Sequence, residues 1–185
     1  HVVKAEILLH GSFATTGIGH GTDKALIAGL LGMRPDDIRI PDSFFLAKKD
    51  GMEFSFSTIT LKDAHPNTAV LRLTGEHGRK IEVQAASIGG GRILIAKLDG
   101  IEVNFSAEKP TLIVHNVDQP GHVAQVTSML AEKQVNIATL QLYRDKRGGY
   151  AVMVIETDQE VPEESVAWLE QLDGIIKVTY INVEE

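Results

Sequence analysis

The residues best suited to chemistry in this chain lie in one glycine- and hydroxyl-rich stretch, residues 11–23. Within it, His20 can exchange a proton near neutral pH, while Thr22 and Asp23 add a hydroxyl and a carboxylate. A strand-like apolar run precedes the stretch, and a helix-like run follows at residues 24–31. Because the start of a helix exposes backbone N–H groups and the positive end of its dipole, we expect a loop here that binds an anion.

The spacing of the glycines excludes the two common nucleotide-binding loops. Gly21 is followed by Thr22 and Asp23, whereas a P-loop requires lysine and then serine or threonine. Gly17 and Gly19 begin a dinucleotide fingerprint, but its third glycine is missing. An ordinary alternative is a tight connection in which Thr22 or Asp23 caps the following helix. The histidine at position 20 fits that alternative less well, because a residue between two glycines has little to pack against.

Two further polar segments favour turns between strands, and the second has a functional alternative. His65 is held extended by the proline after it, and Asn67 and Thr68 complete a turn. Ser87 precedes three glycines at residues 89–91. These glycines form either a simple hairpin or a place where a ligand or another backbone approaches closely.

A second anion-receptive loop follows a strand-like run at residues 111–115. Polar side chains at Asn116 and Asp118 suit an ammonium group, and the backbone amides of Gly121 and His122 suit a carboxylate. This pattern predicts a cradle for an amino acid. The alternative is that Asp118 simply caps the helix that follows.

Composition excludes several classes of site and partner. The chain has 185 residues, no cysteine and a formal net charge of -7. Without cysteine it cannot by itself hold an iron–sulfur cluster or a thiolate-bound zinc ion, and its histidines lack the i, i+4 spacing of a helical metal site. The negative charge argues against nucleic acid and anionic membrane surfaces. No apolar run reaches the roughly 20 residues of a membrane span. Absence of cysteine also fits the cytoplasm.

The order of elements predicts an α+β protein with two domains. Residues 111–182 read as strand, helix, strand, strand, helix, strand, which is the ferredoxin-like βαββαβ arrangement. Residues 1–107 read as a strand, a glycine-rich loop, a helix and then a series of strands, which predicts a mainly antiparallel sheet. Residues 42–49 are a candidate short helix. We therefore expect domains over residues 1–107 and 111–185, joined by a short polar linker that ends in proline.

Two known families share these motifs. Residues 114–158 resemble an ACT domain, a small-molecule regulatory module, in the pattern found at the end of bacterial phosphoglycerate dehydrogenase. The segments HGSFATTGIGHGTDKA, HPNTA and SIGGG resemble the β subunit of iron–sulfur-dependent L-serine dehydratase. That resemblance implies a first domain similar to an allosteric-substrate-binding domain. It also implies a lyase that converts L-serine to pyruvate and ammonia, with a [4Fe–4S] cluster held by the cysteines of a partner α subunit.

The same resemblance implies roles for particular residues. The loop that carries His20, Thr22 and Asp23 would reach into the active site of the α subunit and bind substrate or move a proton. The substrate- and anion-binding residues that it implies are Gly17, Gly19, Gly21, His65, Asn67 and Thr68. The effector-binding residues that it implies in the ACT domain are Asn116, Asp118, Gly121, His122 and Asn136. Pairing of ACT domains edge to edge would make a homodimer.

A serine-rich segment that normally begins this family's β domain is missing here, so we expect an N-terminally truncated domain. The chain alone is then expected to be inactive as a dehydratase, and its role is that of a regulatory and docking subunit. The competing hypothesis is a stand-alone amino-acid sensor, in which the first domain is only a scaffold. An independent enzyme is the least favoured, because no nucleophile–base pair is visible in the sequence.

Overall fold

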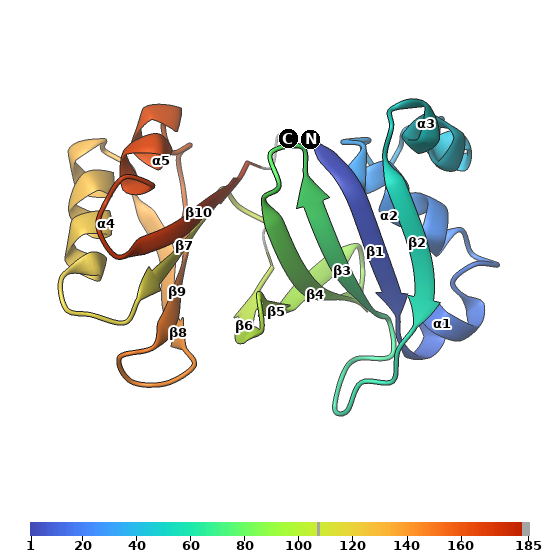
Figure 1. Ribbon diagram of the computed structural model, residues 1–185, viewed down its shortest axis with the longest axis horizontal. Helices are drawn as coiled ribbons and strands as arrows, with labels where there is room; N and C mark the ends of the chain where they lie inside the picture. Colours follow the sequence, from blue (N-terminus) through green and yellow to red (C-terminus); the bar gives the residue numbers. More distant parts are fainter. Residues whose placement is uncertain (107, 183–185) are drawn as a thin grey trace. The chain divides into compact units, whose positions relative to one another are not determined.

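The computed structural model of the protein describes residues 1–106 and 108–182, and the chain divides into two compact units at Gly100. The first sheet has six strands in the order β2-β1-β3-β4-β5-β6 (Figure 1). Its strands are β1 (Val2–Leu9), β2 (Glu53–Thr58), β3 (Thr68–Gly75), β4 (Lys80–Gly89), β5 (Arg92–Leu98) and β6 (Ile101–Phe105). β1 and β2 are parallel, whereas β1–β3, β3–β4 and β4–β5 are antiparallel.

The helices of the first unit lie in the crossover between the two parallel strands. They are α1 (Gly11–Thr16), α2 (Thr22–Leu30), a 3-10 turn η1 (Ile40–Asp42) and α3 (Ser43–Lys49). Alternate residues of β1 point toward them, so Ala5, Ile7 and Leu9 are buried against Ile27 of α2 and Ala47 of α3. The rings of three phenylalanines extend this core, with centroids 5.0 to 6.2 Å apart: Phe44, Phe54 and Phe56.

The stretch predicted as a continuous glycine-rich loop begins instead with a short helix, α1. The hydroxyl of Thr16 donates to the carbonyl of Ser12 at 2.9 Å, and that of Thr15 donates to the carbonyls of Gly11 and Ser12 at 3.3 Å. Phe13 packs against the core of the first unit. A helix of six residues is not stable alone, so α1 depends on these contacts. Such a short helix also has too few apolar positions to show a helical period in the sequence. The loop prediction was therefore wrong for residues 11–16.

The second unit contains a four-stranded antiparallel sheet in the order β10-β7-β9-β8, with two helices on one side (Figure 1). The elements are β7 (Thr111–Val117), α4 (His122–Glu132), β8 (Ile137–Arg144), β9 (Tyr150–Thr157), α5 (Glu163–Leu169) and β10 (Ile175–Ile181). This is the predicted βαββαβ order. The α+β fold class with mostly antiparallel sheets is confirmed.

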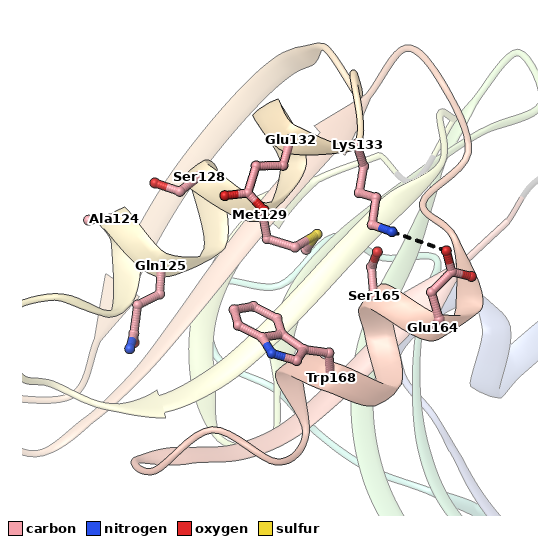
Figure 2. Close-up of a pocket in the computed structure, with 9 residues that line it drawn as sticks. All are labelled: Ala124, Gln125, Ser128, Met129, Glu132, Lys133, Glu164, Ser165 and Trp168. Carbon is pink, nitrogen blue, oxygen red and sulfur yellow. Dashed lines mark hydrogen bonds and ion pairs between the residues drawn. The ribbon is translucent and has the colours of Figure 1, made fainter.

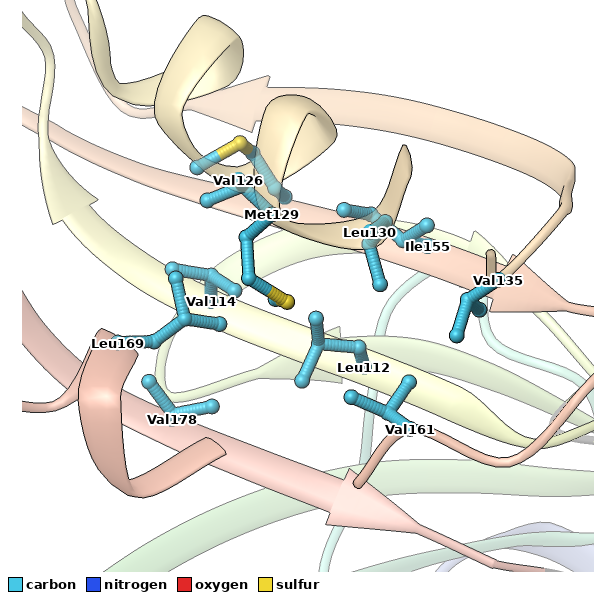
Figure 3. Packing of buried hydrophobic residues seen from close by; sticks show 11 residues of the cluster. Leu112, Val114, Val126, Met129, Leu130, Val135, Ile155, Val161, Leu169 and Val178 are labelled. Carbon is cyan, nitrogen blue, oxygen red and sulfur yellow. The ribbon is translucent and has the colours of Figure 1, made fainter. Parts of the chain in front are cut away.

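The core of the second unit lies between its sheet and its helices (Figure 3). Leu112 and Val114 point from β7 toward Val126 and Leu130 of α4, and all four are fully buried. Leu169 contributes from α5, which ends at this residue. Because α5 is short, its position depends on this packing and not on intrinsic helix stability.

Candidate functional sites

Three sequence motifs that are far apart in the chain meet at one end of the neighbouring strands β1, β3 and β4 of the first sheet. The backbone N–H of His10 donates to the carbonyl of Thr68 at 2.9 Å, and that of Ser12 donates to Pro66 at 2.8 Å. On the other side, the N–H of Ser87 donates to the carbonyl of Asn67 at 3.0 Å. We call residues 10–12, 65–68 and 87 the motif edge. It forms because β3 lies between β1 and β4 and starts where β1 and β4 end.

Gly11 allows the close approach within the motif edge. Its φ is +56°, and a Cβ at this position would lie 2.5 Å from the carbonyl oxygen of Pro66. A side chain would therefore both strain the backbone and push α1 away from the turn at residues 65–68. Gly17 is required for a related reason, because a Cβ there would lie 2.4 Å from the carbonyl oxygen of Phe13.

Local hydrogen bonds hold the rings of both histidines of the motif edge in place. The Nδ1 atom of His65 accepts from the backbone N–H of Asn67 at 3.1 Å, and Nδ1 of His10 accepts from Leu61 at 3.2 Å. In the His65 ring the proton of the neutral form then lies on Nε2, whereas Nδ1 of His10 also lies 3.3 Å from the carbonyl oxygen of Ile59, so either tautomer of His10 has a partner there. The hydroxyl of Thr68 is buried and donates to the carbonyl of His65 at 2.6 Å, so it stabilises the turn. His10 was not among the predicted site residues, although its position immediately after β1 was a signal for it.

Of the three residues predicted to act in catalysis, His20 lies in the turn between α1 and α2, whereas Thr22 and Asp23 lie in the first turn of α2. The backbone N–H of His20 donates to the carbonyls of Thr16 and Gly17, and that of Thr22 donates to Gly17 at 2.8 Å. The His20 ring is exposed. Among residues 1–106 and 108–182, no hydrogen bond joins its ring or the Thr22 hydroxyl to another residue. Both groups are therefore open to a ligand, but no hydrogen bond among the described residues joins them to the motif edge.

The N-terminus of α2 is not capped by Thr22 or Asp23, which was the ordinary alternative to a functional loop. Its N-cap is Gly21, in the left-handed conformation with φ of +74° and without a side-chain hydrogen bond. Asp23 lies in the first turn, and its carboxylate accepts from the N–H of Lys24 at 2.8 Å. Capping by Thr22 or Asp23 was therefore a wrong alternative. The acidic side chain still favours the positive end of the helix dipole.

In the second unit, Asp118 joins the loop between β7 and α4 to the β8–β9 hairpin. Its carboxylate accepts from the N–H of Gly148 at 2.8 Å and from the guanidinium of Arg144 at 3.1 Å. Its own N–H donates to the carbonyl of Gly149 at 2.9 Å. The N-cap of α4 is Gly121, so the alternative in which Asp118 caps this helix was wrong. Its carboxylate is already committed within the chain.

Two buried polar side chains in this region each have one atom with a hydrogen-bond partner and one atom without, among the described residues. Asn116 is 3% exposed and His122 is 7% exposed. The Oδ1 atom of Asn116 and the Nε2 atom of His122 have no hydrogen-bond partner among the described residues. The ring of His122 lies against Gly174, where a Cβ would come within 2.6 Å of it. An unsatisfied buried polar atom costs free energy, so these two atoms are suited to a bound ligand.

The fifth predicted effector residue, Asn136, lies at the opposite end of α4. Its amide donates to Asp158 at 2.7 Å, and its backbone N–H donates to the side chain of Gln159 at 2.7 Å. The register of the sheet places residues 136–137 beside Thr157, whereas Asn116 pairs with Ala151. Within one chain, therefore, Asn136 is not brought together with the loop between β7 and α4.

The ionisation of Asp118 predicts a pH-dependent stability. The N–H of Gly148 and the Arg144 guanidinium hold the pKa of the Asp118 carboxyl below its usual range. A depressed native pKa stabilises the fold above the unfolded value, about 4, and this contribution is lost as the pH falls below it. We expect Asp118→Asn to lower the melting temperature at pH 7, and the difference from the unsubstituted chain to shrink as the pH falls below about 4. The exposed Asp173→Asn is the control, and an equal effect of both substitutions at pH 7 would contradict this role.

The described residues offer neither a metal site nor a membrane-spanning helix. Within residues 1–106 and 108–182, no three His, Asp or Glu side chains are grouped so that they could hold a metal ion. No helix in this part of the chain is long and apolar enough to cross a membrane.

Comparison with known proteins connects these sites to a family. Residues 1–48 match the family described as serine dehydratase beta chain, and residues 110–174 match the ACT domain. The L-serine dehydratase beta chain of Peptoniphilus asaccharolyticus is 35% identical over 181 residues, which cover 97% of this chain and 82% of that protein. The chain belongs to the L-serine dehydratase β-chain family. The resemblance seen in the sequence is thereby confirmed.

Two other relatives show how far the likeness extends along the chain. The probable L-serine dehydratase beta chain of Bacillus subtilis is 37% identical over 175 residues, which cover 95% of this chain and 79% of that protein. The D-3-phosphoglycerate dehydrogenase of Methanocaldococcus jannaschii is 31% identical over 113 residues, but these cover only 22% of that enzyme. The likeness to the β chains therefore extends along almost the whole chain, whereas the dehydrogenase shares one part.

Proposed function

We propose that this chain is the regulatory and docking subunit of an L-serine dehydratase, a lyase that converts L-serine to pyruvate and ammonia. The main support for this proposal is the arrangement of the motif edge. Three segments shared with the family by sequence meet there, since the turn at residues 65–68 is hydrogen-bonded to both of the others, although 77 positions separate His10 and Ser87. Such convergence of polar segments is typical of a site and is not needed for a packed core.

The chain does not supply the ligands of an iron–sulfur cluster. It has no cysteine, and the described residues contain no cluster of metal-binding side chains. We propose that a cysteine-bearing α subunit holds a [4Fe–4S] cluster and that this chain completes the active site from outside. The regulatory subunit would then be inactive alone.

The residues of this chain would bind the substrate and move a proton. Dehydration removes the Cα proton and the Cβ hydroxyl of L-serine as water, and the enamine that forms becomes pyruvate and ammonia by taking up water. The exposed His20 ring is suited to accept or return a proton, because imidazole nitrogens can both donate and accept one and no hydrogen bond occupies the ring among the described residues. The hydroxyl of Thr22 and the N-terminal amides of α2 are suited to the serine carboxylate.

The ACT domain would bind a regulatory amino acid at the loop between β7 and α4. The unpartnered Asn116 and His122 atoms support this role, with Gly121 offering a backbone amide, while Asp118 would position the loop through the hairpin. β8 is an edge strand of its sheet, and Leu140 and Leu142 on it are exposed. We propose that this edge pairs two copies into a homodimer, which would bring Asn136 of one copy toward the effector loop of the other.

Reconstitution with the α subunit tests the proposed function. The chain, the α subunit and a reconstituted cluster are mixed, and pyruvate release from L-serine is followed. We expect pyruvate from the mixture and none from either subunit alone. Absence of pyruvate from a mixture with a spectroscopically intact cluster would contradict the assignment.

The alternative is a stand-alone amino-acid sensor, which the buried unpartnered atoms of Asn116 and His122 also favour. A sensor would bind an amino acid with the same affinity in the presence and absence of the α subunit. The reconstituted mixture separates the two functions, because only a dehydratase subunit makes the α subunit release pyruvate.

A further inference from the structure

A groove of about 620 Å³ lies between α4 and α5, on the helical side of the second unit. Figure 2 shows its lining, in which Gln125, Met129 and Lys133 come from α4 and the residue after it, and Glu164, Ser165 and Trp168 come from α5. None of the predicted effector residues lines it. The volume lies within the range of small-molecule sites in proteins, so the groove is large enough for a ligand.

The centre of the groove is apolar. Met129 is 6% exposed and forms part of the core beneath, whereas Trp168 is 44% exposed. Figure 2 shows the Trp168 indole extending from α5 toward α4. An indole left in water on a helix face loses the stabilisation that burial would give it. A thioether and an indole together form a surface that suits a large apolar group.

A buried hydroxyl without a partner adjoins this surface. Ser165 is 2% exposed, and its Oγ atom has no hydrogen-bond partner among the residues described in the structure. Figure 2 shows the hydroxyl on the side of α5 that faces the groove. Because a buried hydroxyl without a partner costs free energy, a ligand that donates to it or accepts from it would recover that cost.

Charges of both signs lie at the same end of the groove. The Nζ atom of Lys133 is 3.2 Å from a carboxylate oxygen of Glu164, and both side chains are exposed. The Lys133 side chain holds the pKa of the Glu164 carboxyl below its usual range. An exposed ion pair contributes little to stability, so either partner can turn toward a ligand at small cost. The lysine retains N–H donors and the carboxylate retains a free oxygen.

We propose that this groove binds an α-amino acid with a large apolar side chain. The ligand ammonium would lie at Glu164 and the Ser165 hydroxyl, its carboxylate at Lys133, and its side chain between Met129 and Trp168. Each group of such a ligand meets a group of matching chemistry, whereas a simple hydrocarbon would leave the Ser165 hydroxyl unsatisfied. The site does not depend on the proposed dehydratase function, because it is defined by binding to this chain alone.

The groove contains the one tryptophan of the chain, which supplies a specific signal. The full chain is titrated with L-phenylalanine while the tryptophan emission is recorded with excitation that phenylalanine does not absorb. We expect a saturable change. 2-Phenylethylamine, which lacks the carboxylate, and 3-phenylpropanoate, which lacks the ammonium, should each bind at least tenfold more weakly. An unsaturable response, or equal affinity for all three compounds, would overturn the proposal.

Variants locate the ligand. Lys133→Met should weaken L-phenylalanine about tenfold and leave 2-phenylethylamine unchanged. Ser165→Ala should weaken L-phenylalanine several-fold while the melting temperature of the free chain stays equal or rises, because an unsatisfied buried hydroxyl has been removed. Thr127→Ala is the control on α4, since its hydroxyl bonds only to the carbonyls of its own helix. Unchanged affinity in Ser165→Ala, or loss of the signal in Asn116→Ala, would overturn the proposal, the latter by placing the ligand at the loop between β7 and α4.

Discussion

Replacing His20 with alanine is expected to lower pyruvate release by the reconstituted dehydratase about 10²-fold. The imidazole is exposed between Gly19 and Gly21, and no hydrogen bond within the described chain occupies it. If it moves a proton during dehydration, its removal slows the chemical step and not the association of the subunits. The turnover number should therefore fall, while the concentration of this chain that gives half-maximal activity stays the same.

His77→Ala is the matched control for this substitution. His77 is also exposed, and it lies in the turn between β3 and β4, at the end of these strands away from the motif edge. We expect it to leave turnover unchanged. A His20→Ala rate within twofold of the unsubstituted chain would remove this histidine from proton transfer. A large loss in His65→Ala would then assign that role to the turn at residues 65–68.

Replacing Gly11 with alanine is expected to destabilise the first unit by about 2–4 kcal/mol and to abolish most of the dehydratase activity. A side chain at φ of +56° costs about 1–2 kcal/mol by itself. The added Cβ would also lie 2.5 Å from the Pro66 carbonyl oxygen, so the backbone must move apart and the bond from Ser12 to Pro66 is lost. Urea unfolding followed by circular dichroism measures the stability.

Gly90→Ala separates these two contributions. Gly90 has a similar φ of +64°, but a Cβ there would meet nothing within 4 Å. We expect this control to cost only the conformational part, about 1–2 kcal/mol. If Gly11→Ala costs no more than Gly90→Ala, the close approach at Pro66 does not hold the motif edge together, and the positions of α1 and the turn have another cause.

The fold of the second unit could be predicted from sequence because its elements are local. The apolar positions Val126 and Leu130 on α4, and the unbroken β-prone run over β9, each indicate an element within a few residues. α1 could not be predicted in this way. Its six residues are shorter than a stable helix, and its position depends on Phe13 contacting a core that other segments complete.

The motif edge could be predicted only in part. The sequence identified residues 65–68 as a turn and residues 87–91 as a hairpin or a place of close approach, and linked both to the glycine-rich stretch through a family resemblance. Their proximity, however, follows from the strand order β1-β3-β4 and from the register that pairs Thr68 with Ala86. His10 was missed for the same reason, since its ring contacts Leu61 across 51 positions of sequence.

The role of Asp118 shows how a local interpretation can fail. A carboxylate shortly before a helix is a common N-cap, and the sequence offered that alternative. In the structure the carboxylate instead binds the hairpin between β8 and β9, 26 to 30 positions away. The sequence contains no local sign of that contact, because the hairpin reaches the loop only when β7 pairs with β9.

The antiparallel pair of β3 and β4 has one end that does not tolerate inserted residues and one end that does. At the motif edge, one inserted residue would shift Asn67 away from Ser87 and turn the following side chains to the opposite face. The turn at residues 76–79 is exposed and lies at the far end of the same strands. An epitope tag or a fluorescent protein spliced into this turn would therefore give a labelled chain for imaging or pull-down in which the geometry of the motif edge is intact.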